Sequence, residues 1–442
     1  MQGLGYGSSR KSQQGRQSRS RSARHTRAAK CSQISVSSCS TSSYTSSDED
    51  GYSSSYSEVS QAAGKVGAGP RLEKDEVQHF EWRAGLQMNS RYVVSKFLGD
   101  GTFGRVLQAK DCKRNRQVAI KIIRNVDKYT RNAMREAEIL QDIRAADPKQ
   151  CHGCVRLHET FFHEADGERL FCLVCEALGM SLYDLLKQNH YRGLWMQDIQ
   201  SISKQCLQAL RFLHADLNLT HTDLKLENVL LRSSEAPAPS KFPREEFWQS
   251  QQSSPSSSRR TAGSYVRPVC TEIKLIDFGN ATYELEHHSS IINTRQYRAP
   301  EVILSLGWNE LSDLWSIGCI VSELYTGELL FRTHESLEHL ALMQQAVQRF
   351  PHSLLQKAGQ NRNDRFVVKD THSTWRLRWP EGALSESSSS KVQQQQSLHE
   401  MVQKRHRSLA DFTESLLILD PTKRPSARRA LEHVFLTEKF SD

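Results

Sequence analysis

The 442-residue sequence lacks any continuous hydrophobic run of about 18 residues, which excludes a membrane-spanning helix. It also lacks an apolar stretch in its first 47 residues, which carry eight Lys or Arg, so no secretory signal peptide is expected. Hydrophobic residues make up only 37% of the chain, below the ~45–50% of average domains. Part of the chain is therefore expected to lie outside any core. The ten cysteines are scattered, which indicates reduced thiols in the cytosol or nucleus rather than a disulfide framework.

The formal net charge of +9 is concentrated at one end of the chain. Residues 1–47 hold eight basic and no acidic residues, whereas the other 395 residues hold 51 basic and 50 acidic ones. The folded part is therefore nearly neutral, and no direct nucleic-acid site is predicted, since no RNA-recognition motif is visible either. A basic tail can bind a nuclear import receptor, RNA or a membrane surface, or it can simply keep the chain solvated.

Composition divides the chain into a tail and a folded region. Residues 1–79 are rich in Ser and Arg, with 20 Ser among the first 60 residues, and are predicted to be disordered. Residues 80–440 begin with strand-like segments and one helical stretch at 128–144, whose Met134 and Leu140 are expected to be buried. From residue 182 onward the pattern is mainly helical. Two low-complexity segments, 233–268 and 385–396, are predicted to be surface insertions, and most of 233–268 should be dispensable for folding.

A glycine-rich segment follows the first strand-like stretch. Gly99, Gly101 and Gly104 form the pattern G-x-G-x-x-G, which is weak when it stands alone. Residues 105–107 favour a strand rather than the helix of a dinucleotide-binding fold, so we predict a β-hairpin. Glycines would let this hairpin lie close over phosphate groups, whereas an ordinary glycine turn remains the alternative.

A lysine lies at the position expected for a phosphate-binding side chain. Lys121 follows Gly104 by seventeen residues, in a strand-like run of Val, Ala and Ile. Its ammonium could act as a point charge on the α- and β-phosphates, although a surface strand lysine is the simpler alternative. Glu136 in the helical stretch can pair with it, and Glu138 is the rival partner.

The strongest pattern is a set of motifs in a fixed order. Residues 221–228 read His-Thr-Asp-Leu-Lys-Leu-Glu-Asn, and they are followed by Asp-Phe-Gly at 277–279 and Ala-Pro-Glu at 299–301. Together these motifs resemble the protein-kinase signature. Asp223 could accept the proton of a substrate hydroxyl, and Lys225 could neutralise the γ-phosphate. Asn228 and Asp277 would supply the oxygen ligands that Mg²⁺ prefers.

A narrower resemblance lies in the second half of the chain. Residues 277–283, 286–289, 293–304, 307–308 and 315–320 closely resemble the Cdc2-like (LAMMER) kinases, and the similarity covers about residues 80–440. The motif that names the family, Glu-His-Leu-Ala-Met-Met-Glu-Arg, appears at 338–345 with only its first half preserved. This degenerate motif and the Ser/Gln-rich insertions are similar to those of divergent protist members, including kinetoplastid ones.

The resemblance implies an α+β fold with two lobes. A small β-rich lobe would span about 88–178, a larger helical lobe would span about 179–440, and ATP would bind between them. Backbone groups of Glu176 and Leu178 would bind adenine at the hinge, and Cys175 would hold the position before them, where a bulkier residue is usual. The resemblance also implies nucleotide-binding positions on the neighbouring strands: Leu98, Val106 and Ala119.

Three further positions follow from the resemblance as structural ones. Asp313 is expected to brace the catalytic loop, and Arg424 should pair with Glu301. Thr222 stands where many kinases carry an arginine that pairs with a phosphate on the activation segment. Since Thr222 cannot form such a charged pair, activity without an upstream activating kinase is expected.

The resemblance implies an ATP- and Mg²⁺-dependent serine/threonine or dual-specificity kinase. Its substrates would be basic or Ser/Arg-rich nuclear proteins, such as arginine–serine-rich splicing factors, or kinetochore proteins as in divergent protist relatives. A monomeric catalytic domain in the nucleus, or also in the cytoplasm, is expected. The alternative is a pseudokinase scaffold that acts through its tail and insertions.

Overall fold

The computed structural model describes residues 79–165, 167–251, 263–361 and 365–441. The predicted disordered tail, except for His79, lies outside these residues. All described residues belong to one compact unit, Glu73–Asp442. Within the described ranges, no helix combines the length and the hydrophobicity needed to cross a membrane.

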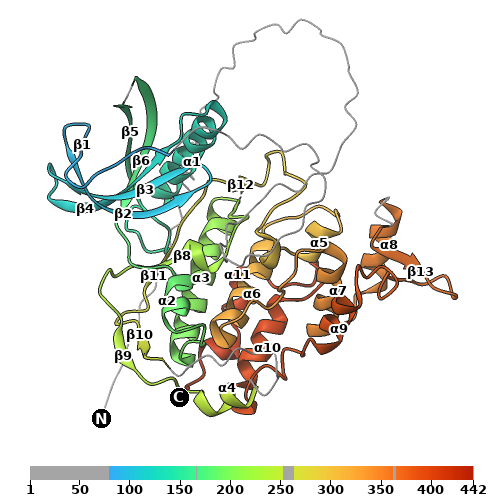
Figure 1. Ribbon diagram of the computed structural model, residues 1–442. Coiled ribbons are helices and arrows are strands. Elements are labelled where there is room, and N and C mark those ends of the chain that lie inside the picture. Colours follow the sequence, from blue (N-terminus) through green and yellow to red (C-terminus); the bar gives the residue numbers. More distant parts are fainter. Residues whose placement is uncertain (1–78, 166, 252–262, 362–364, 442) are drawn as a thin grey trace, which may run out of the picture. The chain divides into compact units, whose positions relative to one another are not determined.

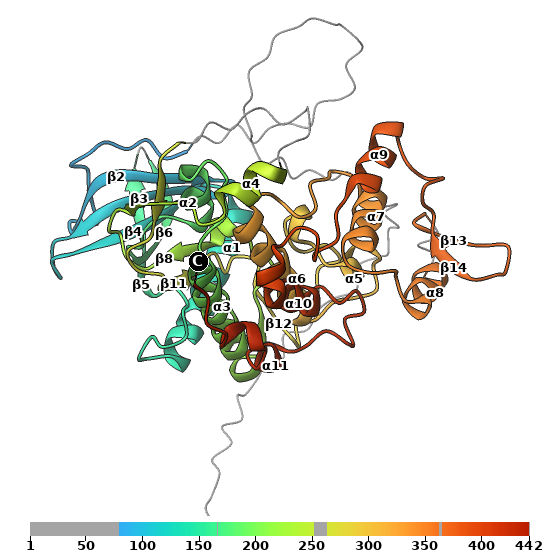
Figure 2. The ribbon, with the colours of Figure 1, turned by 90° about the horizontal axis from the view of Figure 1, so that it is seen from below.

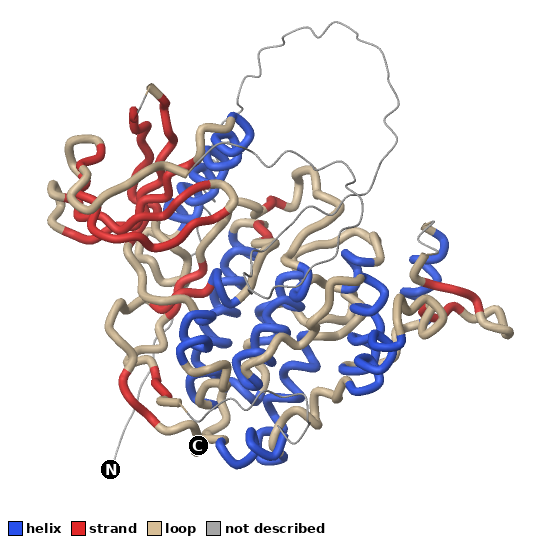
Figure 3. Tube along the Cα trace, viewed as in Figure 1, coloured by secondary structure: helices blue, strands red, loops and turns tan. Residues whose placement is uncertain are grey.

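The first part of the described chain is a six-stranded antiparallel sheet with the order β1-β2-β3-β4-β6-β5. Figure 1 shows this sheet beside the helix α1 (Asp127–Ala146), and Figure 3 shows the same separation of strands and helices. One face of the sheet has its own small hydrophobic core, and the other face joins the main core. The strands are β1 (Gln87–Met88), β2 (Tyr92–Gly101), β3 (Gly104–Asp111), β4 (Arg116–Ile123), β5 (Leu157–Ala165) and β6 (Glu168–Glu176).

The helix α1 packs one face against this sheet. Ala137, Leu140 and Ile143 are buried at helical spacing, as the pattern at 128–144 predicts. Met134 was expected on the buried side but is 37% exposed. The buried face of α1 runs through Ala133 and Ala137, which are four residues apart. Met134 lies at the edge of this face and is therefore partly exposed to solvent.

The second part of the described chain is mainly helical. Its core is built around α6 (Leu311–Thr326), in which Trp315 is fully buried, and α3 (Met196–Asp216) packs against α6. Figure 2 shows the helices clustered on the side opposite β2–β4. The other helices of this part are α2 (Leu182–Gln188), α4 (Glu245–Gln251), α5 (Pro300–Ile303), α7 (Ser336–Ala346), α8 (His352–Gln360), α9 (Glu386–Gln394), α10 (Arg407–Leu416), α11 (Ala427–Ala430), and the 3₁₀ turns η1 (Leu226–Asn228), η2 (Arg295–Tyr297), η3 (Lys404–His406) and η4 (Val434–Leu436).

Short two-stranded ladders tie the loops of the helical part together. Two of them, β8–β11 and β7–β12, flank the motifs at 221–228 and 277–279. Each ladder is antiparallel, and each fixes a loop by backbone hydrogen bonds. Their strands are β7 (Leu219–Thr220), β8 (Val229–Leu231), β9 (Ala238–Ser240), β10 (Tyr265–Arg267), β11 (Ile273–Leu275), β12 (Thr282–Tyr283), β13 (Val367–Lys369) and β14 (Trp375–Leu377).

The described ends of segment 233–268 are more ordered than the sequence suggests. Strands β9 and β10 pair, and Arg244 is buried, donating to Leu194 O at 2.7 Å and to Tyr325 O at 3.1 Å. Tyr265 donates to Gly193 O at 3.0 Å. The described ends of this segment are therefore anchored by Arg244 and Tyr265 to the chain before α3 and to the end of α6, whereas most other side chains of 238–251 are exposed or half-exposed, and its dispensability for folding stays a prediction.

The segment 385–396 also differs from its prediction as a low-complexity insertion. It forms the helix α9, whose first turn is capped by the Ser385 hydroxyl. Glu338 on α7 accepts hydrogen bonds from Ser388 and from Lys391, the latter at 2.7 Å. These tertiary contacts order a Ser-rich sequence with poor intrinsic helix propensity.

Candidate active site

The glycine-rich segment forms the predicted β-hairpin between β2 and β3. Gly101 pairs with Gly104, and Arg105 bridges the hairpin to Asp100 through two hydrogen bonds of 2.7 and 2.8 Å. A Cβ added to Gly104 would lie 2.2 Å from Ile122 O, so this position needs glycine because the backbones of β3 and β4 come so close there. Gly99 has no atom within 4 Å of its added Cβ and borders open space.

Alternation along the strands places the predicted nucleotide-binding side chains on one face. Ile120 and Ile122 of β4 belong to the core on the far face, so Ala119 and Lys121 point the opposite way, toward the helical part. Val106 is paired with Lys121. Leu98 on β2 is 43% exposed and lies next to Gly99, which pairs with Val106.

Lys121 lies at the centre of an ion-pair network. Its Nζ is 2.8 Å from Glu136 Oε2 on α1 and 3.2 Å from Asp277 Oδ1, which joins the sheet, α1 and the Asp-Phe-Gly motif. Glu138 is exposed, so the structure selects Glu136 as the partner. Burial lowers the pKa of Lys121, but the charges of Asp277 and Glu136 outweigh it and raise that pKa above its ordinary value. The lysine therefore stays cationic at physiological pH.

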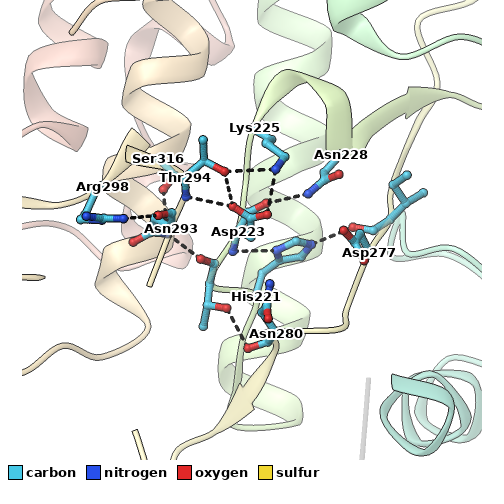
Figure 4. A network of polar contacts seen from close by, with 12 residues as sticks. His221, Asp223, Lys225, Asn228, Asp277, Asn280, Asn293, Thr294, Arg298 and Ser316 are labelled. Atoms are coloured by element: carbon cyan, nitrogen blue, oxygen red, sulfur yellow. Dashed lines mark hydrogen bonds and ion pairs between the residues drawn. The ribbon is translucent and has the colours of Figure 1, made fainter. Parts of the chain in front are cut away.

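The catalytic-loop motif places Asp223 among three donor groups (Figure 4). Its carboxylate accepts from Lys225 Nζ at 3.0 Å, from the Thr294 backbone N–H at 3.0 Å and from Thr294 Oγ1 at 2.7 Å. Asn228 Nδ2 donates to the backbone oxygen of Asp223 at 2.8 Å. The carboxylate is thus fixed by groups from the catalytic loop and from the activation segment, residues 277–301.

Asp313 at the start of α6 braces this loop, as predicted. Its two carboxylate oxygens accept from the backbone N–H groups of His221 at 2.8 Å and Thr222 at 3.0 Å. Asp313 is fully buried, so these bonds are shielded from water. The predicted pair between Arg424 and Glu301 is also confirmed, with contacts of 2.8 and 2.9 Å between buried side chains.

The buried side chain of Phe278 anchors the Asp-Phe-Gly motif in the core. Phe278 is fully buried and lies 5.0 Å from the His221 ring, while Asp277 has a positive φ of 62°. This left-handed conformation is uncommon for a residue other than glycine, and it turns the Asp277 side chain toward Lys121. Phe278 was not singled out from the sequence, although a large apolar residue beside a charged motif is the signal for such an anchor.

Asn228 and Asp277 fit a hard cation. Asn228 uses its amide nitrogen for Asp223 O, which leaves its Oδ1 available for a cation, and Asp277 directs one oxygen to Lys121. Lys121 also lowers the pKa of Asp277, which keeps this carboxylate ionised. An amide and a carboxylate oxygen are the kind of ligands that Mg²⁺ takes, together with phosphate oxygens.

The segment predicted as the hinge, residues 173–179, begins within the last part of β6. Cys175 is paired with Ala119 on β4 and is half-buried in the main core, so it lies on the same face as Lys121. Burial raises the pKa of the Cys175 thiol to about 12. Glu176 is held by Arg156, whose backbone N–H donates to its carboxylate at 2.8 Å, and Leu178 packs against the core.

A second group of carboxylates lies beside the catalytic loop and was not predicted. Tyr297 donates to Glu323 at 2.6 Å, and burial, with the nearby charge of Glu227, raises the pKa of Glu323 to about 8. Glu227 is half-buried, and its Oε2 has no hydrogen-bond partner among the described residues. Burial raises its pKa as well, with further contributions from Asp223 and Asp184.

Comparison with known proteins agrees with this geometry. Residues 92–436 match the protein kinase domain family. The serine/threonine-protein kinase AFC2 of Arabidopsis thaliana is 38% identical over 391 residues, which cover 87% of this chain and 86% of AFC2. The human dual specificity protein kinase CLK1 is 36% identical over 368 residues, covering 82% of this chain and 69% of CLK1. The crystal structure of the PF14_0431 kinase domain superimposes with a TM-score of 0.72 at 40% identity, covering 82% of this chain and all of that one.

The chain therefore belongs to the protein kinase family, and the expected bilobal fold with a β-sheet lobe and a helical lobe is confirmed. Within that family it is a serine/threonine or dual-specificity kinase of the Cdc2-like group that contains the CLK and AFC kinases, as the motifs at 277–304 predict. Kinases of this family use ATP and Mg²⁺ and act on protein substrates.

Proposed function

We propose that this chain transfers the γ-phosphoryl group of Mg²⁺·ATP to serine or threonine hydroxyls of basic nuclear proteins. The observation that carries the proposal is the network around Lys121 and Asp223. Lys121 lies within hydrogen-bond distance of Glu136 and Asp277, and Asp223 lies within hydrogen-bond distance of Lys225 and Thr294, which are the side chains that phosphoryl transfer would need from the two lobes.

Each residue would have one task. Lys121, held by Glu136, would bind the α- and β-phosphates, while the glycines of the β2–β3 hairpin would approach the phosphates from above. Bound Mg²⁺ would neutralise phosphate charge, and Asn228 and Asp277 would hold it. Asp223 would accept the hydroxyl proton of the substrate. Burial lowers the pKa of Lys225, but the charge and hydrogen bond of Asp223 raise that pKa overall, so Lys225 would stay cationic to stabilise the transferred group.

The preference for basic substrates rests on the carboxylates beside the catalytic loop. Glu227 lies four residues after Asp223 and has an oxygen with no partner among the described residues, and Glu323 is buried with a pKa raised to about 8. Glu227 destabilises the charged form of Glu323, and a cation bound at the half-buried Glu227 would relieve this repulsion. An arginine of the substrate, near the hydroxyl to be phosphorylated, would supply that cation and two parallel hydrogen bonds.

The pathway is proposed from the resemblance alone. Arginine–serine-rich splicing factors fit a cation-binding site beside the catalytic loop, and kinetochore proteins with basic serine motifs would fit it equally well. We also propose that the catalytic domain acts as a monomer in the nucleus, with adenine bound at Glu176 and Leu178.

The test is a phosphotransfer assay with the purified full chain. Serine peptides flanked by arginines should be phosphorylated, and matched peptides flanked by glutamates should react at least about tenfold more slowly, a difference of ~1.4 kcal/mol in the barrier. Asp223→Asn is the control for catalysis. Absence of any turnover in the wild type would favour the pseudokinase scaffold, and equal rates on both peptides would refute the basic preference alone.

A further inference from the structure

The activation segment contacts α1 through two polar pairs that lie next to the Lys121 site. Glu286 forms an ion pair with Arg135, and the Tyr283 hydroxyl donates to Asp142 at 2.7 Å. Arg135 and Asp142 are seven residues apart, which is close to two helical turns, so both lie on the same face of α1.

The position of Arg135 in the helix gives this contact its significance. Arg135 directly precedes Glu136, whose carboxylate lies 2.8 Å from Lys121 Nζ. A restraint on Arg135 therefore acts on the same turn of α1 that carries Glu136. If α1 rotates or moves outward, the Lys121–Glu136 pair is lost, and with it the placement of the lysine.

Glu286 is part of a well-defined turn rather than a loose loop. Its backbone N–H donates to Tyr283 O at 3.0 Å, and its carboxylate accepts from the Tyr283 N–H at 3.2 Å. Tyr283 belongs to β12, which pairs with β7 just before the catalytic loop. The Arg135 guanidinium also holds the pKa of Glu286 below its ordinary value, so the carboxylate is ionised at neutral pH.

We propose that Glu286 is a positioning residue that holds α1, through Arg135, where Glu136 can bind Lys121. A carboxylate built into the activation segment would thus supply the anionic contact that a phosphoryl group supplies in kinases switched on by phosphorylation. The inference rests on the proposed role of Lys121 in binding ATP. It gives Glu286 no contact with the substrate or the nucleotide.

A double-mutant cycle on the full chain tests this proposal. Glu286→Ala and Arg135→Ala should each lower kcat/KM for ATP about fivefold, equivalent to ~1 kcal/mol and near the upper limit for a partly exposed ion pair. The double variant should be no worse than either single one, because both remove the same contact. The KM for the peptide should stay unchanged. Glu286→Gln, which keeps the shape and loses the charge, should show a smaller loss.

The matched control is Glu381→Ala. Glu381 pairs with Arg376 at 2.6 Å, and its exposed ion pair resembles the Arg135–Glu286 pair in solvent access but lies far from the site in the sequence. This variant should keep wild-type kcat/KM, and all variants should unfold at temperatures within a few degrees of the wild type. Additive losses in the cycle, or losses below twofold in both single variants, would overturn the proposal. Full activity of Lys121→Met would instead refute the proposed function itself.

Discussion

The carbonyl oxygen of Thr222 accepts hydrogen bonds from both the backbone N–H and the side-chain amide of Asn293, each at 2.9 Å. The Thr222 hydroxyl donates to Asn280 O at 2.8 Å. Thr222 therefore binds both Asn280, near the start of the activation segment, and Asn293, in its second half. Figure 4 labels both asparagines around the catalytic loop. These contacts use neutral groups, and Thr222 holds a positive φ of 68° while making them.

The contacts of Thr222 predict activity without phosphorylation. Phosphatase-treated recombinant protein should keep most of its turnover, because neutral hydrogen bonds and Glu286 already hold the activation segment. Steady-state kinetics before and after phosphatase treatment, with mass spectrometry to verify removal of phosphate, is the measurement. A loss of more than about tenfold, equivalent to ~1.4 kcal/mol in the barrier, would contradict this account.

The half-buried Cys175 at the predicted hinge should react selectively. Since its pKa is raised to about 12, the thiolate is scarce at neutral pH, and free alkylating reagents should react slowly and faster only as the pH rises. An electrophile held at the hinge should label it through proximity, and ATP should suppress that labelling. Intact-protein mass spectrometry of the wild type and Cys175→Ala provides the comparison. Labelling that persists in Cys175→Ala would show that the hinge lies elsewhere.

The ends of segment 233–268 should matter for stability. Arg244→Ala removes donors from two buried carbonyl groups and should lower the free energy of unfolding by ~2–4 kcal/mol. Arg232→Ala is the matched control, because its pair with Glu272 is exposed and contributes at most ~1 kcal/mol. Denaturant unfolding of both variants checks this. Equal free energies of unfolding for the two variants would show that the contacts of Arg244 do not stabilise the fold, as expected for a dispensable insertion.

The raised pKa of Glu323 predicts a pH-dependent substrate preference. As the pH rises through about 8, Glu323 loses its proton and should attract a substrate arginine more strongly, so the KM for arginine-containing peptides should fall between pH 7 and 9. The KM for a peptide without arginine should stay flat, and Glu323→Gln should remove the difference. Because the raised pKa means that the folded state binds this proton more tightly, the contribution of Glu323 to stability is present below its ordinary pKa and is lost as the pH rises through 8. An unchanged KM ratio across this range would argue against an arginine site at Glu227, next to the buried Glu323.

The candidate catalytic residues could be proposed from the sequence because each lies in a contiguous motif. Asp223, Lys225 and Asn228 lie within six residues, and Asp277 is the first residue of the Asp-Phe-Gly tripeptide. The choice of Glu136 over Glu138 as the partner of Lys121 rested on the resemblance to the kinases, and the structure agrees, since Glu138 is exposed. The fold class followed from the same motifs and from the change from strand-like to helical patterns.

Other features depended on contacts between residues far apart in the sequence. Glu323 lies on α6, almost a hundred residues after Glu227, and only the fold brings both near Tyr297. The helix α9 has a Ser/Gln-rich sequence that predicts a loop, and it is ordered by Glu338 on another helix. Such tertiary contacts override local propensity, and a single sequence carries no signal of them.

The most direct measurement of the central claim is the activity of Asp223→Asn beside its affinity for ATP. Asparagine keeps the size of the side chain but cannot accept the proton of a substrate hydroxyl. We expect the purified variant to bind ATP as the wild type does, since Lys121, Glu136 and Asp277 are untouched. Phosphotransfer to an arginine-flanked serine peptide should fall by at least about a hundredfold. Turnover close to that of the wild type would contradict the role given to Asp223 and the mechanism built on it.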